Sequence, residues 1–238
     1  MRPPGDSPAK PFVVAIDGPA ASGKGTLAHR LAQRFGLAHL DTGKLYRVAA
    51  DLVLIRGGDP ADPATAELAA QEVAPTLTAD PTLIFAPRLL GNDVTRASSV
   101  MATIPAVRTA LLSFQRSFAM HPPPPSPGVA AKGAVLDGRD IGTAVCRDAA
   151  VKLFVTASPE ARAKRRVKEL RGRGAAAIYE DVLQDLMERD ARDSDRWAAP
   201  LLVAPDAELI DTTTLDADAV LERAADITAR AFKEWEWL

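Results

Sequence analysis

Short apolar runs alternate with amphipathic segments along most of this chain. Leu27, Leu31 and Phe35 recur at i, i+4 and i+8, which predicts a helix over 26–35 that ends at Gly36. Short apolar runs predict buried strands at 12–16, 37–40, 134–136, 151–155 and 208–211. Helical patterns separate them at 44–55, near 98, and at 105–120, 159–170, 178–193 and 217–235. This alternation predicts an α/β fold, a parallel sheet with helices on both faces.

Two segments depart from that rhythm. Within residues 59–95, an Ala-rich stretch predicts a short helix over 64–73, and the β-type run Thr82–Phe85 predicts antiparallel strands. We therefore expect a small α+β insert there. Residues 121–128 are rich in proline and predict a stiff solvated connector, with a polyproline-motif ligand as the alternative. The expected layout is a disordered tail at 1–10, a core at 11–58 and 96–238, and an insert at 59–95.

Composition excludes several classes of protein. The chain has 238 residues, of which 47% are hydrophobic and 25% charged, as in ordinary globular proteins. A net charge of −2 provides no general basic field for nucleic acid, and there is no apolar run of about 18 residues that would span a membrane. Cys146 is the only cysteine, so we expect a small semi-buried side chain and a reducing, cytoplasmic location. The N-terminus lacks the apolar stretch of a signal peptide.

A glycine-rich turn joins the first predicted strand to the first predicted helix. Glycines let backbone N–H groups point at an anion, and the helix N-terminus adds a favourable dipole. Lys24 can then reach the β and γ oxygens of a bound triphosphate. The alternative, a glycine-rich turn without a ligand, needs this spacing to arise by chance. We therefore expect an ATP-binding phosphate loop made of Gly18, Pro19, Ala20, Ala21, Ser22, Gly23, Lys24, Gly25 and Thr26.

The phosphate loop departs from the general pattern at one position. Gly25 follows Lys24 where the usual loop has a Ser or Thr hydroxyl, and the hydroxyl comes one residue later, at Thr26. We therefore expect the Mg²⁺ that accompanies ATP to be contacted by Thr26 directly or through water. The Gly-Lys-Gly-Thr form resembles the nucleoside monophosphate kinases.

Three further polar segments suggest a second anion site. Residues 41–47 and 137–140 each follow a predicted strand, and ligands of doubly wound sheets lie beyond that edge. Residues 188–196 end a helix with three arginines and four acids. Arginines from several segments suit a phosphate acceptor, because guanidinium groups grip phosphate through paired hydrogen bonds. Taken singly, each segment could be a turn or a salt-bridged surface.

These motifs together resemble bacterial cytidylate kinases from about residue 11 to 230. The resemblance implies transfer of the γ-phosphate of ATP to CMP or dCMP, in pyrimidine nucleotide metabolism, with Mg²⁺. It implies that Arg47, Arg139 and Arg196 hold the acceptor phosphate beside Thr42 and Tyr46, and that Arg189 and Asp193 meet the sugar. Ser99 and Arg108 would lie against the pyrimidine, and Asp140 would accept from the cytosine amine. The implied catalytic set is Lys24, Arg139, Arg189 and Arg196, and the implied CMP-binding set is Thr42, Tyr46, Arg47, Ser99, Arg108, Asp137, Arg139, Asp140, Arg189, Asp193 and Arg196.

The same family implies a short helical lid over ATP at about 159–196, and the insert resembles an enlarged monophosphate-binding region. We expect a monomer without nucleic-acid or membrane partners. Other classes remain open alternatives: an adenylate, uridylate or shikimate kinase, a nucleotide-dependent switch or motor, and a purely structural nucleotide-binding module. The number of segments available for a second anion favours the kinase.

Overall fold

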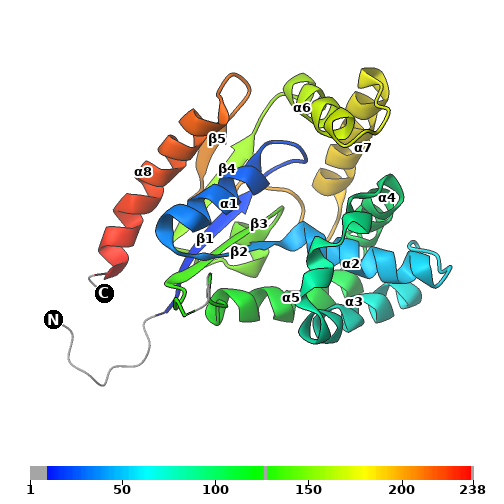
Figure 1. Cartoon of the computed structure of the whole chain (residues 1–238), viewed down its shortest axis with the longest axis horizontal. Helices are drawn as coiled ribbons and strands as arrows, with labels where there is room; N and C mark the ends of the chain where they lie inside the picture. Colours follow the sequence, from blue (N-terminus) through cyan, green and yellow to red (C-terminus); the bar gives the residue numbers. More distant parts are fainter. Residues whose placement is uncertain (1–9, 126–127, 237–238) are drawn as a thin grey trace.

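The computed structural model describes residues 10–125 and 128–236, and its helices and strands alternate as the sequence predicts (Figure 1). The five described strands form one sheet in the order β2-β3-β1-β4-β5, and all four pairings are parallel. The strands are β1 (Phe12–Asp17), β2 (Ala38–Asp41), β3 (Gly133–Gly138), β4 (Val151–Thr156) and β5 (Glu208–Asp211). The α-helices are α1 (Lys24–Phe35), α2 (Thr42–Ile55), α3 (Pro63–Ala79), α4 (Asn92–Met101), α5 (Pro105–Met120), α6 (Pro159–Gly172), α7 (Tyr179–Asp195) and α8 (Ala217–Glu236). The predicted α/β fold is confirmed.

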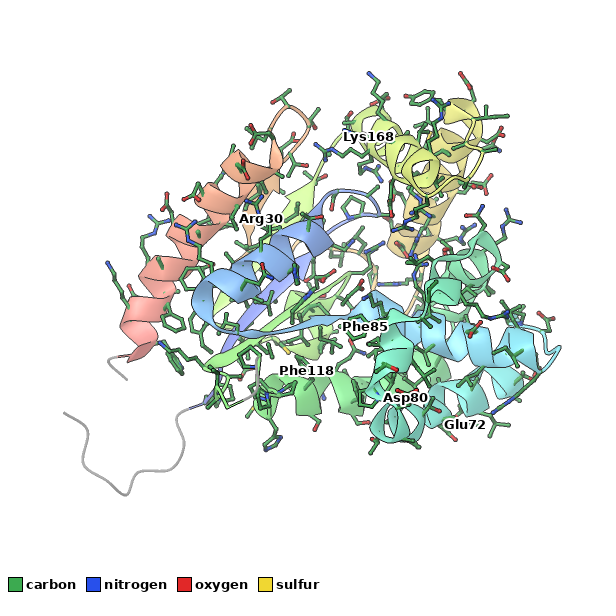
Figure 2. All side chains as sticks on the ribbon, viewed as in Figure 1. Arg30, Glu72, Asp80, Phe85, Phe118 and Lys168 are labelled. Carbon is green, nitrogen blue, oxygen red and sulfur yellow. The ribbon has the colours of Figure 1, made fainter. Side chains whose placement is uncertain are left out.

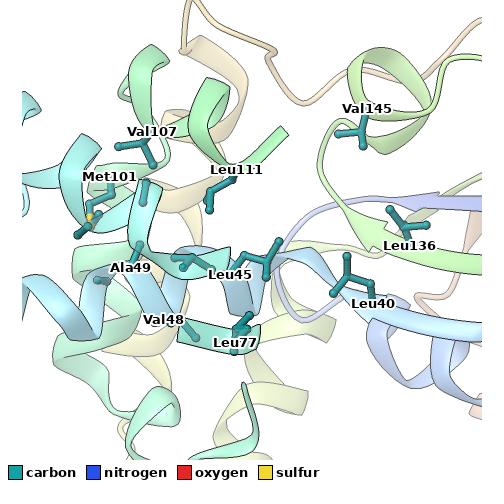
Figure 3. Close-up of a cluster of buried hydrophobic side chains, with 14 of the residues drawn as sticks. Leu40, Leu45, Val48, Ala49, Leu77, Met101, Val107, Leu111, Leu136 and Val145 are labelled. Atoms are coloured by element: carbon teal, nitrogen blue, oxygen red, sulfur yellow. The ribbon is translucent and has the colours of Figure 1, made fainter. Parts of the chain in front are cut away.

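Strand β1 shows why helices cover both faces of the sheet. All six of its residues are buried, and alternate side chains point to opposite faces. Phe12, Val14 and Ile16 pack with α1 and α8, whereas Val13 and Ala15 join the cluster that includes α2, α3 and α5. Figure 3 shows part of this second cluster, in which sheet and helix side chains meet. The two apolar layers leave only the strand ends free to hold polar groups.

Helix α1 ends where the sequence predicts. Gly36 adopts a left-handed conformation with φ 64°, and its N–H donates to the carbonyl of Ala32. Glycine is favoured there because a Cβ would be strained at positive φ. This stop turns the chain directly into β2.

The predicted antiparallel strands of the insert are wrong. Residues 59–95, all of which the structure describes, contain α3, two 3₁₀-helices at Pro81–Phe85 and Pro87–Leu90, and the start of α4. The β-type run 82–85 follows Asp80, whose carboxylate accepts from both the N–H and the hydroxyl of Thr82. That cap, together with Pro81 in the first turn, starts a helical turn instead of a strand. The insert is therefore helical, not α+β.

Four smaller expectations concern the N-terminal tail, the proline-rich loop, Cys146 and membrane-spanning segments. Residues 1–9 of the expected tail and residues 126–127 of the proline-rich loop lie outside the described residues, while Lys10 donates to Asp148. Cys146 is buried where a semi-buried side chain was expected, and burial raises the pKa of its thiol to about 11, which disfavours the reactive thiolate. Within the described residues, no single helix is long and apolar enough to cross a membrane; α4 and α5 reach that length and composition only as a pair, bent by 100°.

Candidate active site

Acidic residues end three neighbouring strands and define the polar edge of the sheet. Asp17, Asp41 and Asp137 stand at or near the carboxyl ends of β1, β2 and β3. The β2–β3 register places Asp41 directly opposite Asp137. A cleft of about 820 Å³ lies at this edge, between the phosphate loop, α2, α4 and the α6–α7 pair. Ligands of parallel sheets bind at this edge, so the cleft is the candidate active site.

The phosphate loop is held in a conformation that only glycine permits at its first residue. Gly18 has φ +149°, and a Cβ there would lie 2.0 Å from the carbonyl oxygen of Val155. Gly23 is left-handed with φ 91° and precedes the first turn of α1. Asp17, the residue before the loop, fixes the end of β1 to the segment after β3, because its carboxylate accepts from the N–H groups of Ile141 and Gly142, both at 2.8 Å. The loop is therefore shaped before any ligand arrives.

Lys24 lines the cleft, and its Nζ donates to the carbonyl of Pro19 at 3.2 Å. Burial, with Arg139 nearby, lowers the pKa of this lysine to about 7. A polyphosphate would supply the negative charge that favours the ammonium form. Lys24 is therefore suited to bind an anion more strongly when protonated.

This lowered pKa predicts proton uptake when ATP binds. Free Lys24 is charged below about pH 7 and loses its charge above it, whereas bound phosphate restores the charged form. The affinity for ATP should therefore fall as pH rises from 7 to 9, by at most about tenfold per pH unit. Calorimetric titrations from pH 6 to 9 in two buffers of different ionisation enthalpy would measure this. Lys24→Arg is the control, because an arginine stays charged and should flatten the profile; an equally flat wild-type profile would contradict the argument.

Four arginines from outside the phosphate loop, Arg47, Arg139, Arg189 and Arg196, converge on the same cleft. Burial, with Arg139 nearby, lowers the pKa of Arg189 to about 9. Within the described part of the chain, the buried Nε of Arg189 and Nη2 of Arg196 have no hydrogen-bond partner. Arg47 donates to the carbonyl of Leu89 and to Thr95, which directs it between α2 and α4. Such a concentration of buried and half-buried cations with unused donors is suited to a bound anion.

Asp193 holds part of this cluster together. Its Oδ2 accepts from Arg139 Nε at 2.8 Å, and its Oδ1 lies 3.6 Å from Arg196 Nη1. Burial raises the pKa of this carboxyl, but Arg139 and Arg189 outweigh that effect and hold it below its ordinary value. Asp193 is therefore ionised and keeps the arginines in place.

A second buried ion pair forms another corner of the cleft. Asp140 accepts from Arg108 and lies 4.0 Å from Arg196. The guanidinium of Arg108 also stands over the ring of Tyr46, 5.7 Å from its centroid. Burial raises the pKa of Tyr46 to about 12, so its hydroxyl stays protonated. This corner combines an aromatic ring, a fixed carboxylate and a cation, which suits a polar heterocycle.

The structure brings the sequence-predicted residues together. All eleven residues of the implied CMP-binding set line the cleft, as do Ala20, Ala21, Gly23, Lys24, Gly25 and Thr26 of the phosphate loop. Gly18, Pro19 and Ser22 do not line it; Ser22 is fully buried. The hydroxyl of Thr42 is already used, because it donates to the carbonyl of Asp137 at 2.8 Å.

Several cleft residues were not among the predicted site residues. Arg192 donates to the hydroxyl of Ser99 at 3.4 Å, and Arg96, Arg165 and Arg166 also line the cleft. Arg192 lies in the charged run 188–196, so the sequence could have predicted it as a site residue. Arg96 belongs to no recognisable motif, and only the packing of α4 against α2 identifies it as a cleft residue.

Comparison with known proteins decides the family. The sequence model of the family described as cytidylate kinase matches residues 14–230. The chain belongs to the cytidylate kinase family. It is 52% identical over 219 residues to a protein of Rhodospirillum rubrum named cytidylate kinase, covering 92% of this chain and 97% of that protein. A protein of Granulibacter bethesdensis with the same name is 53% identical over 219 residues, with the same coverage of both chains.

The match to the cytidylate kinase family includes both sides of the cleft, because residues 14–230 contain the phosphate loop and the run 188–196. Among solved structures, an uncharacterized protein from Eubacterium ventriosum superposes with a TM-score of 0.52. It covers 93% of this chain and 99% of its own and is 15% identical, so it supports the fold alone.

Proposed function

We propose that this member of the cytidylate kinase family transfers the γ-phosphate of ATP to CMP or dCMP, giving CDP or dCDP. The observation that carries the proposal is the arginine cluster that shares one cleft with the phosphate loop, with buried unused donor atoms on Arg189 and Arg196. A kinase whose acceptor is itself a phosphate must bring two anions together, and it needs cations on both sides. A protein that only hydrolyses ATP does not need the second set.

The contacts support distinct roles for the acceptor residues. Lys24, Arg139, Arg189 and Arg196 would neutralise the transferring group and the acceptor phosphate. Arg47 would join the phosphate contacts, with Thr42 and Tyr46 beside it. Because Asp193 already holds Arg139, an arriving phosphate would compete for that arginine and free a carboxylate oxygen for the sugar hydroxyls. The corner formed by Asp140, Arg108 and Ser99 would receive cytosine, whose amine needs an acceptor.

The residues around Lys24 fit a Mg²⁺ ion carried in with ATP. Thr26, Asp41 and Asp137 all line the cleft, and both carboxylates lie close enough to Lys24 to raise its pKa against the effect of burial. Burial, followed by the facing Asp137, raises the pKa of Asp41, so the charge of this carboxylate is not fully compensated in the cleft. Mg²⁺ in such sites keeps several waters and uses one or two carboxylates with the substrate phosphates. Thr26, Asp41 and Asp137 would hold the hydrated ion, which would supply positive charge against the triphosphate.

The proposed function also assigns roles to the insert and to the lid segment. The helical insert 59–95 would contribute to the acceptor side, and the segment 159–196 would act as the lid over ATP. A monomeric state and a cytoplasmic location stay predictions.

An acceptor panel tests the function directly. Purified protein with ATP and Mg²⁺ would be offered CMP, dCMP, UMP, AMP and shikimate in a coupled assay of ADP release. CMP and dCMP should give the highest kcat/KM, and ADP release without an acceptor should be much slower. A higher rate with AMP or shikimate would overturn the assignment, and acceptor-independent release would point to an ATPase.

Replacing Arg196 tests the anion site. Arg196→Met should raise the KM for CMP by about 100-fold, since it removes a buried charged donor from the acceptor phosphate. Arg30→Met is a matched control, because Arg30 pairs with exposed Asp218 on the outer surface (Figure 2) and should leave both KM values unchanged. If Arg196→Met lowered only the melting temperature, Arg196 would be a structural ion-pair residue.

A further inference from the structure

The phosphate loop depends on other segments to satisfy its backbone carbonyls. A loop that directs its N–H groups at an anion leaves carbonyl oxygens on its outer side, and buried carbonyls need donors. The carbonyl of Ser22 accepts from Thr212 Oγ1 at 3.0 Å and from Arg165 Nη1 at 3.4 Å. The carbonyl of Ala20 accepts from Arg162 Nη1 at 3.2 Å. Helix α6 therefore grips the loop at two points.

Arg162 does more than support the loop. Its side chain is 3% exposed and donates in three directions: Nε to the carbonyl of Ala157 at 3.0 Å, Nη1 to Ala20, and Nη2 to Asp190 Oδ2 at 2.6 Å. Asp190 lies on α7 next to Arg189 and three residues before Asp193. One rigid, planar guanidinium thus joins the phosphate loop to the helix that carries acceptor-side arginines.

The surroundings of this contact favour a fixed geometry. Ala20 packs with Ala163 and Val167 of α6 and with Val182 and Leu186 of α7 in one small apolar cluster. The other carboxylate oxygen of Asp190 is buried without a hydrogen-bond partner among the described residues. Loss of Arg162 would therefore remove the bond to Oδ2 as well and leave both oxygens of this carboxylate without a described protein partner, so α7 would have to shift to expose them to water.

We propose that Arg162 is a positioning residue for phosphoryl transfer, holding the acceptor helix α7 in register with the ATP loop through Ala20 and Asp190. Arg162 does not line the cleft, whereas Arg165 and Arg166 of the same helix do. It therefore acts through its two partners and does not touch either substrate. The proposal rests on the proposed function, since it assigns ATP to the loop and CMP to α7. In-line transfer tolerates little displacement, and a misplacement of about 1 Å can cost about 100-fold in rate.

Arg162→Lys, Asp190→Asn and their combination test the proposal, with kcat, both KM values and the melting temperature measured for each. Lysine keeps the charge but donates from a single nitrogen, so it cannot reach the three acceptors that the guanidinium meets with three separate nitrogens. Arg162→Lys should therefore lower kcat by about 10- to 100-fold and raise the KM of both ATP and CMP. Asp190→Asn should raise mainly the KM for CMP, by about fivefold to tenfold. It weakens the contact of Arg162 with α7, whereas the hydrogen bond from Arg162 to the carbonyl of Ala20 in the ATP loop remains. The double variant should match Arg162→Lys, since both changes break one linkage.

Lys168→Met is the matched control, because Lys168 lies exposed on the outer side of the same helix (Figure 2). It should leave all four quantities unchanged. A lowered melting temperature with kcat and KM within twofold of wild type for both single variants would make Arg162 merely structural and overturn the proposal. Multiplying effects in the double variant would also overturn it. Failure of the proposed function is separate, because the wild-type protein itself would then not turn over CMP.

Discussion

Lys24→Met is expected to lower kcat by about 1,000-fold while leaving CMP binding largely intact. The substitution keeps the length of the side chain but removes the only charge that the phosphate loop itself directs into the cleft. Removing one preorganised group that stabilises transition-state charge in a water-poor site typically costs 100- to 1,000-fold. The acceptor arginines lie on other segments, so they still hold CMP. Steady-state kinetics, with CMP affinity from calorimetry, would measure the two effects separately.

Lys44→Met provides the comparison for this experiment. Lys44 stands over the ring of Phe85, 4.6 Å from its centroid, and does not line the cleft. Its loss should therefore leave kcat within about twofold. If Lys24→Met kept its turnover, the phosphate-loop argument would fail. If it lost CMP affinity in the same proportion as turnover, the two sides of the cleft would be less independent than the contacts indicate.

The sequence predicted the sheet well because its strands are buried on both faces and flanked by clear helical periodicity. The sequence-based prediction was wrong in the insert, where a helix cap and prolines oppose the β-type pattern of apolar residues. Helix α3 continues through Pro75 to Ala79, beyond the predicted end at 73. Val73 and Leu77 are both buried one turn apart, so packing offsets the hydrogen bond that the proline removes. Propensity alone could not show which effect would dominate.

The site was predictable as a set of residues but not as a set of contacts. Arginines and acids that follow parallel strands predict a polar site, because the carboxyl ends of parallel strands lie at the same edge of the sheet. Their pairing depends on distant segments: Arg139 meets Asp193 across 54 residues, and Arg162 meets Ala20 across 142. No local pattern encodes such distances. The contacts of Arg162 and Arg165 with the loop carbonyls were therefore not predictable from their place in the expected lid segment 159–196.

Asp140→Asn should change the preference for the base more than any other single substitution in the cleft. Asp140 is 8% exposed and is oriented by Arg108, so its carboxylate can accept from the cytosine amine but cannot donate to uracil. An asparagine amide keeps the size and can present either an oxygen or an NH₂ group. We expect kcat/KM for CMP to fall by about 100-fold, because a charged acceptor is lost in a buried site. The ratio of kcat/KM for CMP over UMP should fall by at least about tenfold.

Asp148→Asn separates this effect from a general loss of charge. Asp148 lies, like Asp140, between β3 and β4, but it is exposed and pairs with Lys10. Its replacement should therefore leave the ratio of kcat/KM for CMP over UMP unchanged. Melting temperatures of both variants would show whether freeing Arg108 also destabilises the corner. An unchanged CMP-to-UMP ratio in Asp140→Asn would mean that other groups select the base, most directly Ser99 and Arg108 in the same corner. A changed ratio with intact ATP affinity would assign base recognition to this carboxylate, because the phosphate loop does not touch it.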